Sequence, residues 1–187
     1  MGFERYLKLI RKMNMGRWAT EFMHKRKNVS EHSFSVIQIG QMLALLEESF
    51  GNTVDWKTLS MKLSNHDVPE AITGDINSEV KNSNKEMKTM IEIIEKESVH
   101  QAVLRWMDEE YRSIYEKSLL DGKDDSLEGK ILTGADLIDA LMECMEEIEL
   151  GNGKVFQGKY EKILERIKES ELESVAFFVK EILPKMD

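Results

Sequence analysis

Residues 65–75 read Asn-His-Asp-Val-Pro-Glu-Ala-Ile-Thr-Gly-Asp and lie between two segments whose apolar residues recur at helical spacing. Within this stretch, His66 and Asp67 offer a nitrogen and an oxygen ligand to a divalent cation from adjacent positions. Glu70 follows at a spacing that returns it to the same side of a helical path, and Asp75 follows a glycine that permits a sharp turn. Two adjacent residues cannot complete a coordination sphere, so the other ligands must come from elsewhere.

The sequence around this stretch predicts helices throughout. Pro69 lacks an amide hydrogen, so it is expected to kink the preceding helix or to start a fresh turn. We expect helices over residues 3–13, 30–49, 55–67, 126–150, 155–168 and 171–183, and two or three within 84–121, broken near His100 or Asp108. Ser30 is the expected N-cap of its helix. No alternating run of β-branched residues predicts a strand, so the expected fold is a single all-α domain, residues 1–187, of about eight helices.

Composition excludes several classes of protein. The net charge of -9 argues against binding to a nucleic-acid polymer through broad phosphate neutralisation, although a small phosphorylated ligand stays compatible. Cys144 is the only cysteine, which excludes an intrachain disulfide framework and favours a reducing compartment. Neither a signal peptide nor an apolar run long enough to span a bilayer is evident, so the expected location is cytoplasmic, away from membranes.

Two further residues are candidate ligands. His32 occurs in the first turn of a largely apolar helix, where a histidine is more often a core residue, but His66-Asp67 as a partner favours ligation. Asp136 lies in an apolar helical segment beside small residues, where a carboxylate is costly unless it is paired or bound to metal. The alternative, that Asp136 or Asp139 simply faces solvent, stays open because periodicity does not choose between them.

Two histidines and two aspartates form a mixed nitrogen and oxygen set, which suits manganese, cobalt, nickel, iron or zinc, and magnesium less naturally. Such a cation could polarise a phosphoryl oxygen, with Glu70 as a general base or as the group that orients the attacking water. Arg17-Trp18 could bind a phosphate and pack on a sugar or base, or could simply be solvated.

Together these motifs resemble a known family. A histidine, a His-Asp pair and a distant aspartate are the signature of the HD-domain metal-dependent phosphohydrolases, and the local words resemble their 5'-deoxynucleotidase (YfbR-like) branch. Those words are Arg17-Trp18, Asn-Val-Ser-Glu-His-Ser at 28–33, His66-Asp67 with Glu70 and Thr73-Gly74-Asp75, Ala135-Asp136, Glu146-Glu147 and Gly151-Asn152. The resemblance runs from about residue 5 to about residue 156.

The resemblance implies an HD fold and a site with assigned roles. His32, His66, Asp67 and Asp136 would hold the divalent cation, which we expect to be cobalt, manganese or magnesium, with zinc, nickel and iron also compatible. Glu70 would assist the attacking water, Arg17 would contact the phosphate, and Trp18 would favour 2'-deoxyribose. Asp75, a candidate catalytic residue together with Glu70, would contact the sugar hydroxyl or the phosphate and metal. The expected function is hydrolysis of phosphate from 2'-deoxynucleotides by a metal-activated water, in a homodimer.

Three alternatives stay open. The basic stretch at 23–27 and Val68-Pro69 depart from the commonest pattern of the family, so the substrates could be nucleoside di- or triphosphates or modified adenine nucleotides, with a second metal beside Glu70 or Asp75. A regulatory HD module could bind a nucleotide without hydrolysing it. A di-iron carboxylate bundle would need two Glu-x-x-His elements, and the chain offers only one, at 97–100.

Overall fold

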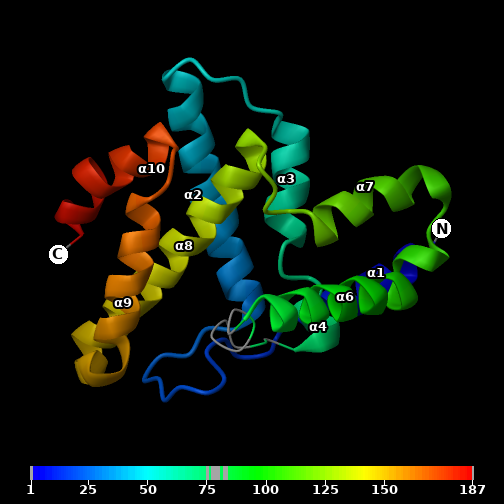
Figure 1. Cartoon of the computed structure of the whole chain (residues 1–187), viewed down its shortest axis with the longest axis horizontal. Coiled ribbons are helices and arrows are strands. Elements are labelled where there is room, and N and C mark those ends of the chain that lie inside the picture. Colours follow the sequence, from blue (N-terminus) through cyan, green and yellow to red (C-terminus); the bar gives the residue numbers. More distant parts are fainter. Residues whose placement is uncertain (1, 75, 77–80, 82–83, 187) are drawn as a thin grey trace.

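The computed structural model describes residues 2–74, 76, 81 and 84–186, and most of these are helical (Figure 1). The longer α-helices are α1 (Phe3–Ile10), α2 (Val29–Ser49), α3 (Trp56–Asn65), α6 (Lys85–Ala102), α7 (Glu109–Leu120), α8 (Leu127–Glu147) and α9 (Gly153–Lys168). Shorter elements are α4 (Glu70–Thr73), α10 (Glu173–Phe177), the 3-10 turns η1 (Leu104–Trp106) and η4 (Leu183–Lys185), and the π-turns η2 (Ile148–Asn152) and η3 (Phe178–Ile182).

The all-α prediction is confirmed. Within the described residues there are seven α-helices of eight residues or more, against about eight expected, and the only β-type contact is an isolated bridge between Gly16 and Asn28. The expected break within 84–121 lies at residues 103–108, between α6 and α7. The segment expected as one helix over 171–183 divides into α10 and two tighter or wider turns.

Two hydrophobic clusters form the interior. The larger lies where α8 crosses α2 at the centre of the molecule, between α3 on one side and α9 on the other (Figure 1). It includes Val36, Leu43, Leu63, Ile131, Ile138, Leu141 and Val175. The smaller lies beneath α1, α6 and α7 and includes Leu9, Val29, Val68, Val99, Leu104 and Leu119. Both α2 and the segment after α3 pass from one cluster to the other, so polar residues at these crossings lie at the seam between the clusters.

The N-terminus of α2 corrects one expectation. The N-cap is Asn28, not Ser30: the Asn28 side chain accepts a hydrogen bond from the Glu31 amide at 2.9 Å, and the Glu31 carboxylate accepts one from the Asn28 amide at 2.8 Å. This reciprocal arrangement pairs two amides that the helix leaves unpaired. The Ser30 hydroxyl instead donates to the Met13 carbonyl at 2.8 Å, which ties the start of α2 to the segment after α1.

The end of α3 lies two residues earlier than expected. The helix stops at Asn65, and His66 and Asp67 belong to the turn that leads to α4. Pro69 explains the stop, because its ring would clash with the carbonyl four residues before it, that of Asn65. The prediction that Pro69 begins a fresh turn is confirmed, since it is the N-cap of α4.

The packing of α2 on α3 generates a test of stability. A methyl group at Gly40 would lie 2.5 Å and 2.7 Å from the two terminal carbons of Leu63, which is buried. We expect Gly40→Ala to lower the free energy of unfolding by roughly 1–2 kcal/mol, because overpacking outweighs the better helix propensity of alanine. Gly158→Ala on α9 is the control, since nothing lies within 4 Å of the new methyl group. Equal stability of the two variants in urea unfolding would contradict this account.

Candidate active site

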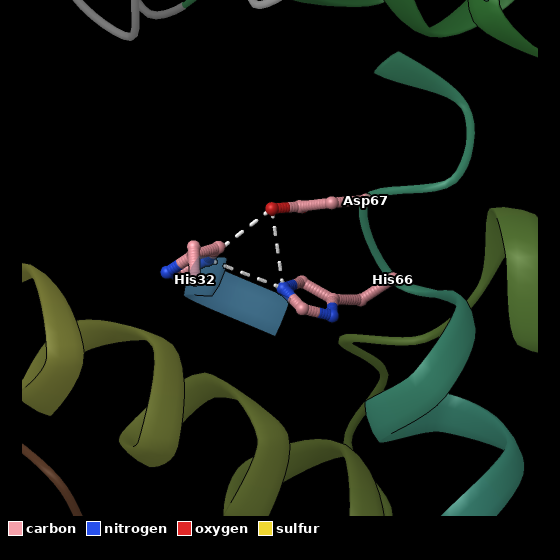
Figure 2. A group of neighbouring side chains, drawn as sticks. All are labelled: His32, His66 and Asp67. Carbon is pink, nitrogen blue, oxygen red and sulfur yellow. Dashed lines mark hydrogen bonds and ion pairs between the residues drawn. The ribbon is translucent and has the colours of Figure 1, made fainter. Parts of the chain in front are cut away.

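Three side chains converge at the seam between the two clusters. His32 projects from the first turns of α2, and His66 and Asp67 follow the end of α3 in the turn (Figure 2). The Nε2 atoms of the two rings lie 3.4 Å apart, and Asp67 Oδ2 lies 3.2 Å from that of His32 and 3.3 Å from that of His66. One oxygen and two ring nitrogens therefore face a common point, as the ligands of a cation must.

The far side of each ring is held by a hydrogen bond. His32 Nδ1 lies 2.6 Å from Asp139 Oδ2, and His66 Nδ1 lies 3.0 Å from the Leu63 carbonyl oxygen. Both partners are acceptors, so each Nδ1 is the donor and each Nε2 faces the common point. Asp139, on α8, is buried, which excludes the alternative that it faces solvent.

Asp136 approaches the same point from α8. Its Oδ1 lies 3.2 Å from His32 Nε2, and its Oδ2 lies 2.5 Å from the ammonium of Lys123. The four residues predicted as ligands are thus brought together from α2, α8 and the turn after α3, although the tightest group comprises only His32, His66 and Asp67. Lys123 was not expected here, because it lies in a polar loop.

The electrostatics of this cluster favour a positive charge at its centre. Burial alone would lower the pKa of His32, but hydrogen bonds to Asp136, Asp139 and Asp67 outweigh it and raise that pKa to about 11. Burial would likewise raise the pKa of Asp67, yet His66 and His32 hold it well below its usual range. The pKa of Asp136 is also held well below its usual range, against burial, by Lys123 and His32. Two ionised carboxylates beside two oriented imidazoles fit a divalent cation.

Arg17 and Trp18 are held beside the cluster by Glu143, a residue that the sequence did not single out. Glu143, buried on α8, accepts hydrogen bonds from Arg17 Nε at 3.1 Å and from Trp18 Nε1 at 2.8 Å. Arg17 Nη1 also lies 3.7 Å from Asp67 Oδ2. Trp18 has a φ of 53°, a left-handed conformation that is rare for a large side chain, and its ring packs edge-on against Phe156.

The basic stretch at 23–27 is held by α8 as well. The backbone amides of His24 and Lys25 donate to the buried carboxylate of Glu147 at 3.0 Å and 2.8 Å, and the Lys25 ammonium lies 3.0 Å from Glu146. This stretch therefore anchors the preceding loop, and none of its residues lines the cavity described next. The sequence pattern that could have indicated these anchoring contacts is the set of acidic residues at 139, 143 and 147, spaced four apart in an apolar helix.

A cavity of about 1070 Å³ opens over the cluster. Its lining includes the predicted site residues Arg17, Trp18, His66, Asp67, Glu70 and Asp136. Lysine and arginine side chains also line it, at positions 81, 88, 96, 123, 159, 162 and 166.

Asp75, which was expected to contact substrate, lies outside the described residues. The Glu-x-x-His element has both Glu97 and His100 exposed on α6, outside the cluster.

None of the described helices combines the length and the apolar character that crossing a bilayer requires.

The chain resembles solved structures along its whole length. A crystal structure described as an HD-domain phosphohydrolase from Listeria innocua superposes with a TM-score of 0.89 at 37% identity, covering 100% of this chain and 90% of that one. A protein from Pyrococcus horikoshii shares the fold, with a TM-score of 0.71 at 22% identity over 98% of this chain and 96% of its own.

Curated sequences point to one branch. A 5'-deoxynucleotidase from Vibrio cholerae is 28% identical over 180 residues, which are 96% of this chain and 92% of that protein. One from an Enterobacter strain is 30% identical over 182 residues, 95% of this chain and 86% of that protein. The model of the family described as 5'-deoxynucleotidase YfbR-like matches residues 5–186. The chain belongs to the 5'-deoxynucleotidase YfbR-like family of HD-domain proteins.

Proposed function

We propose that the protein is a metal-dependent phosphohydrolase that removes phosphate from 2'-deoxynucleotides. The observation that carries this proposal is the convergence of His32 Nε2, His66 Nε2 and Asp67 Oδ2 within 3.4 Å of one another beneath a large cavity. Membership of the 5'-deoxynucleotidase YfbR-like family, and the names of the relatives from Vibrio cholerae and Enterobacter, support the substrate class.

His32, His66, Asp67 and Asp136 are the proposed ligands, supported by their geometry and by a charge balance that favours a cation. When bound, a divalent cation would polarise a phosphoryl oxygen and lower the pKa of a water molecule. Cobalt, manganese or magnesium is proposed, with zinc, nickel and iron also compatible with the mixed donor set.

Other residues of the cavity are proposed to handle the water and the substrate. Glu70, at the start of α4, would take the proton of the attacking water. Arg17 would bind a phosphate oxygen, because Glu143 holds its Nε and leaves its terminal nitrogens beside Asp67. Trp18 would pack against the sugar and disfavour a 2'-hydroxyl, and its strained backbone and its bond to Glu143 support a fixed position. Asp75 is proposed as a sugar or phosphate contact on the resemblance alone.

The domain boundaries and location are proposed too. A single domain over residues 1–187 is supported by α2, which carries Val29 in one hydrophobic cluster and Val36 in the other. A cytoplasmic location is supported by the absence of a second cysteine to pair with the buried Cys144.

The test of this function is a phosphate-release panel. It spans deoxy- and ribonucleoside mono-, di- and triphosphates with magnesium, manganese and cobalt each present. We expect release from deoxynucleoside monophosphates, abolished by a chelator and by His66→Ala, because the cation loses a ligand. His100→Ala is the matched control, since His100 is exposed on α6. Full activity with chelator and in His66→Ala would refute metal dependence; tight nucleotide binding without release would favour a regulatory module.

Two substitutions should separate catalysis from metal binding. Glu70→Gln keeps the shape but removes the base, so we expect kcat to fall by about 10²- to 10⁴-fold with the affinity for Mn²⁺ unchanged. Asp139→Asn weakens the hydrogen bond that orients His32, so we expect the affinity for Mn²⁺ to fall by roughly 10- to 100-fold. Mn²⁺ titration followed by paramagnetic resonance, beside steady-state kinetics, checks both. A Glu70→Gln variant that loses metal as Asp139→Asn does would contradict the assignment of Glu70.

A homodimer is proposed through α6. Exposed apolar side chains at Met87, Met90 and Ile94 recur at helical spacing along this helix, beside the exposed Ile93. These apolar side chains form one exposed stripe along α6, which a second copy of the same helix would cover.

Sedimentation should give a mass near twice 21.7 kDa for the wild-type chain. We expect Met90→Asp with Ile94→Asp to halve that mass, because buried charge opposes the apolar contact. Leu45→Asp is the control, since Leu45 is equally exposed but lies on α2. A monomeric wild-type chain, or a double variant that stays dimeric, would reject this interface.

A further inference from the structure

Lys123 contacts the carboxylate of Asp136, which is also a candidate ligand of the metal. Asp136 Oδ1 lies 3.2 Å from His32 Nε2, on the side where the three-residue cluster converges. Asp136 Oδ2 lies 2.5 Å from Lys123 Nζ. Because the ammonium contacts the second oxygen, the first stays available to a cation. Lys123 is therefore placed next to the candidate cation position without competing for it.

The loop that carries Lys123 is fixed by a second, buried lysine. Lys62, on α3, lies 2.6 Å from Asp124 Oδ1 and donates to the Ser126 hydroxyl at 3.2 Å. Its ammonium also reaches the Asp121 carbonyl at 3.5 Å. The residues on both sides of Lys123 are thus held against α3, the helix that His66 directly follows. These contacts hold the Lys123 backbone in a fixed position beside the cluster, as a preorganised binding group requires.

Lys123 and Arg17 flank the cluster on two different carboxylates. Arg17 Nη1 lies 3.7 Å from Asp67 Oδ2, and Lys123 Nζ lies against Asp136; both residues line the cavity. Some 45% of the Lys123 side chain is exposed. An ammonium has three donors, of which Asp136 takes one, so the others are available to a ligand in the cavity.

We propose that Lys123 is a phosphate-binding residue that, together with Arg17, donates to a non-bridging oxygen of the substrate's phosphate. This inference rests on the proposed phosphohydrolase function. A fixed positive charge there would favour binding of the dianionic group and would stabilise the negative charge that shifts over its oxygens during hydrolysis. The competing role is purely local: Lys123 could serve only to neutralise Asp136, and then its loss would act on the metal rather than on phosphate.

The chain offers a closely matched control. Lys130 is also a lysine with 41% of its side chain exposed, and it pairs with a carboxylate, Glu171, at 2.7 Å. It does not line the cavity over the cluster. Lys123→Met and Lys130→Met therefore make the same change of charge and size, and each breaks one ion pair of an exposed lysine. Lys123→Arg keeps the charge and tests whether it is the charge that acts.

The experiment measures inorganic phosphate and a 2'-deoxynucleoside as competitive inhibitors of phosphate release, beside Mn²⁺ affinity. For Lys123→Met we expect phosphate to inhibit roughly 10- to 100-fold more weakly and kcat/KM to fall by a similar factor. Inhibition by the deoxynucleoside, which lacks phosphate, and Mn²⁺ affinity should match those of Lys130→Met. Lys123→Arg should recover most of the phosphate affinity.

Two results would overturn the proposal. One is an unchanged inhibition constant for phosphate in Lys123→Met; the other is a loss matched by an equal loss of Mn²⁺ affinity, which would assign Lys123 to Asp136 alone. Failure of the underlying function is distinguishable, because the wild-type chain would then release no phosphate from any nucleotide. In that case, calorimetric binding of inorganic phosphate to the Mn²⁺-loaded wild-type and Lys123→Met chains still decides the role of Lys123.

Discussion

The buried carboxylates of α8 are the constraint on which the site depends. A carboxylate removed from water is costly unless it is paired and hydrogen-bonded, so each must find donors on a neighbouring segment. Asp139 pairs with the ring of His32, and Glu143 with Arg17 and Trp18. One helix thereby positions the imidazole on α2 and the two cavity residues of the N-terminal segment. The need to pair buried carboxylates, in addition to apolar packing, brings these distant residues into one place.

The position of the site between two hydrophobic clusters also helps to hold its residues in place. His32 lies three residues after Val29 of the smaller cluster and four before Val36 of the larger one. Buried apolar side chains pack the helices together within each cluster, while polar groups and the cavity lie at the seam between the clusters. A site for an anionic substrate and a cation needs polar groups that packed helices hold in fixed positions, because both ligands must be bound without rearrangement.

Helical periodicity was sufficient to predict most of the fold, and where it failed the cause was local chemistry. The all-α class and the break between α6 and α7 follow from apolar spacing and from few breakers. The wrong N-cap at Ser30 arose because Asn28 and Glu31 satisfy two amides together, which a single hydroxyl cannot do. The early end of α3 is a steric effect of Pro69 that spacing alone does not measure.

The sequence by itself determined the kinds of residue available for chemistry: a His-Asp pair, a histidine in a helix and an aspartate among apolar residues, in an order that resembles HD-domain phosphohydrolases. Only the tertiary structure decided their partners. It assigned Asp139 to His32 and Glu143 to Arg17, and it placed Lys123 beside Asp136. The physical reason is that hydrogen bonds and ion pairs depend on distances of about 3 Å across segments more than ten residues apart, which helical periodicity does not encode.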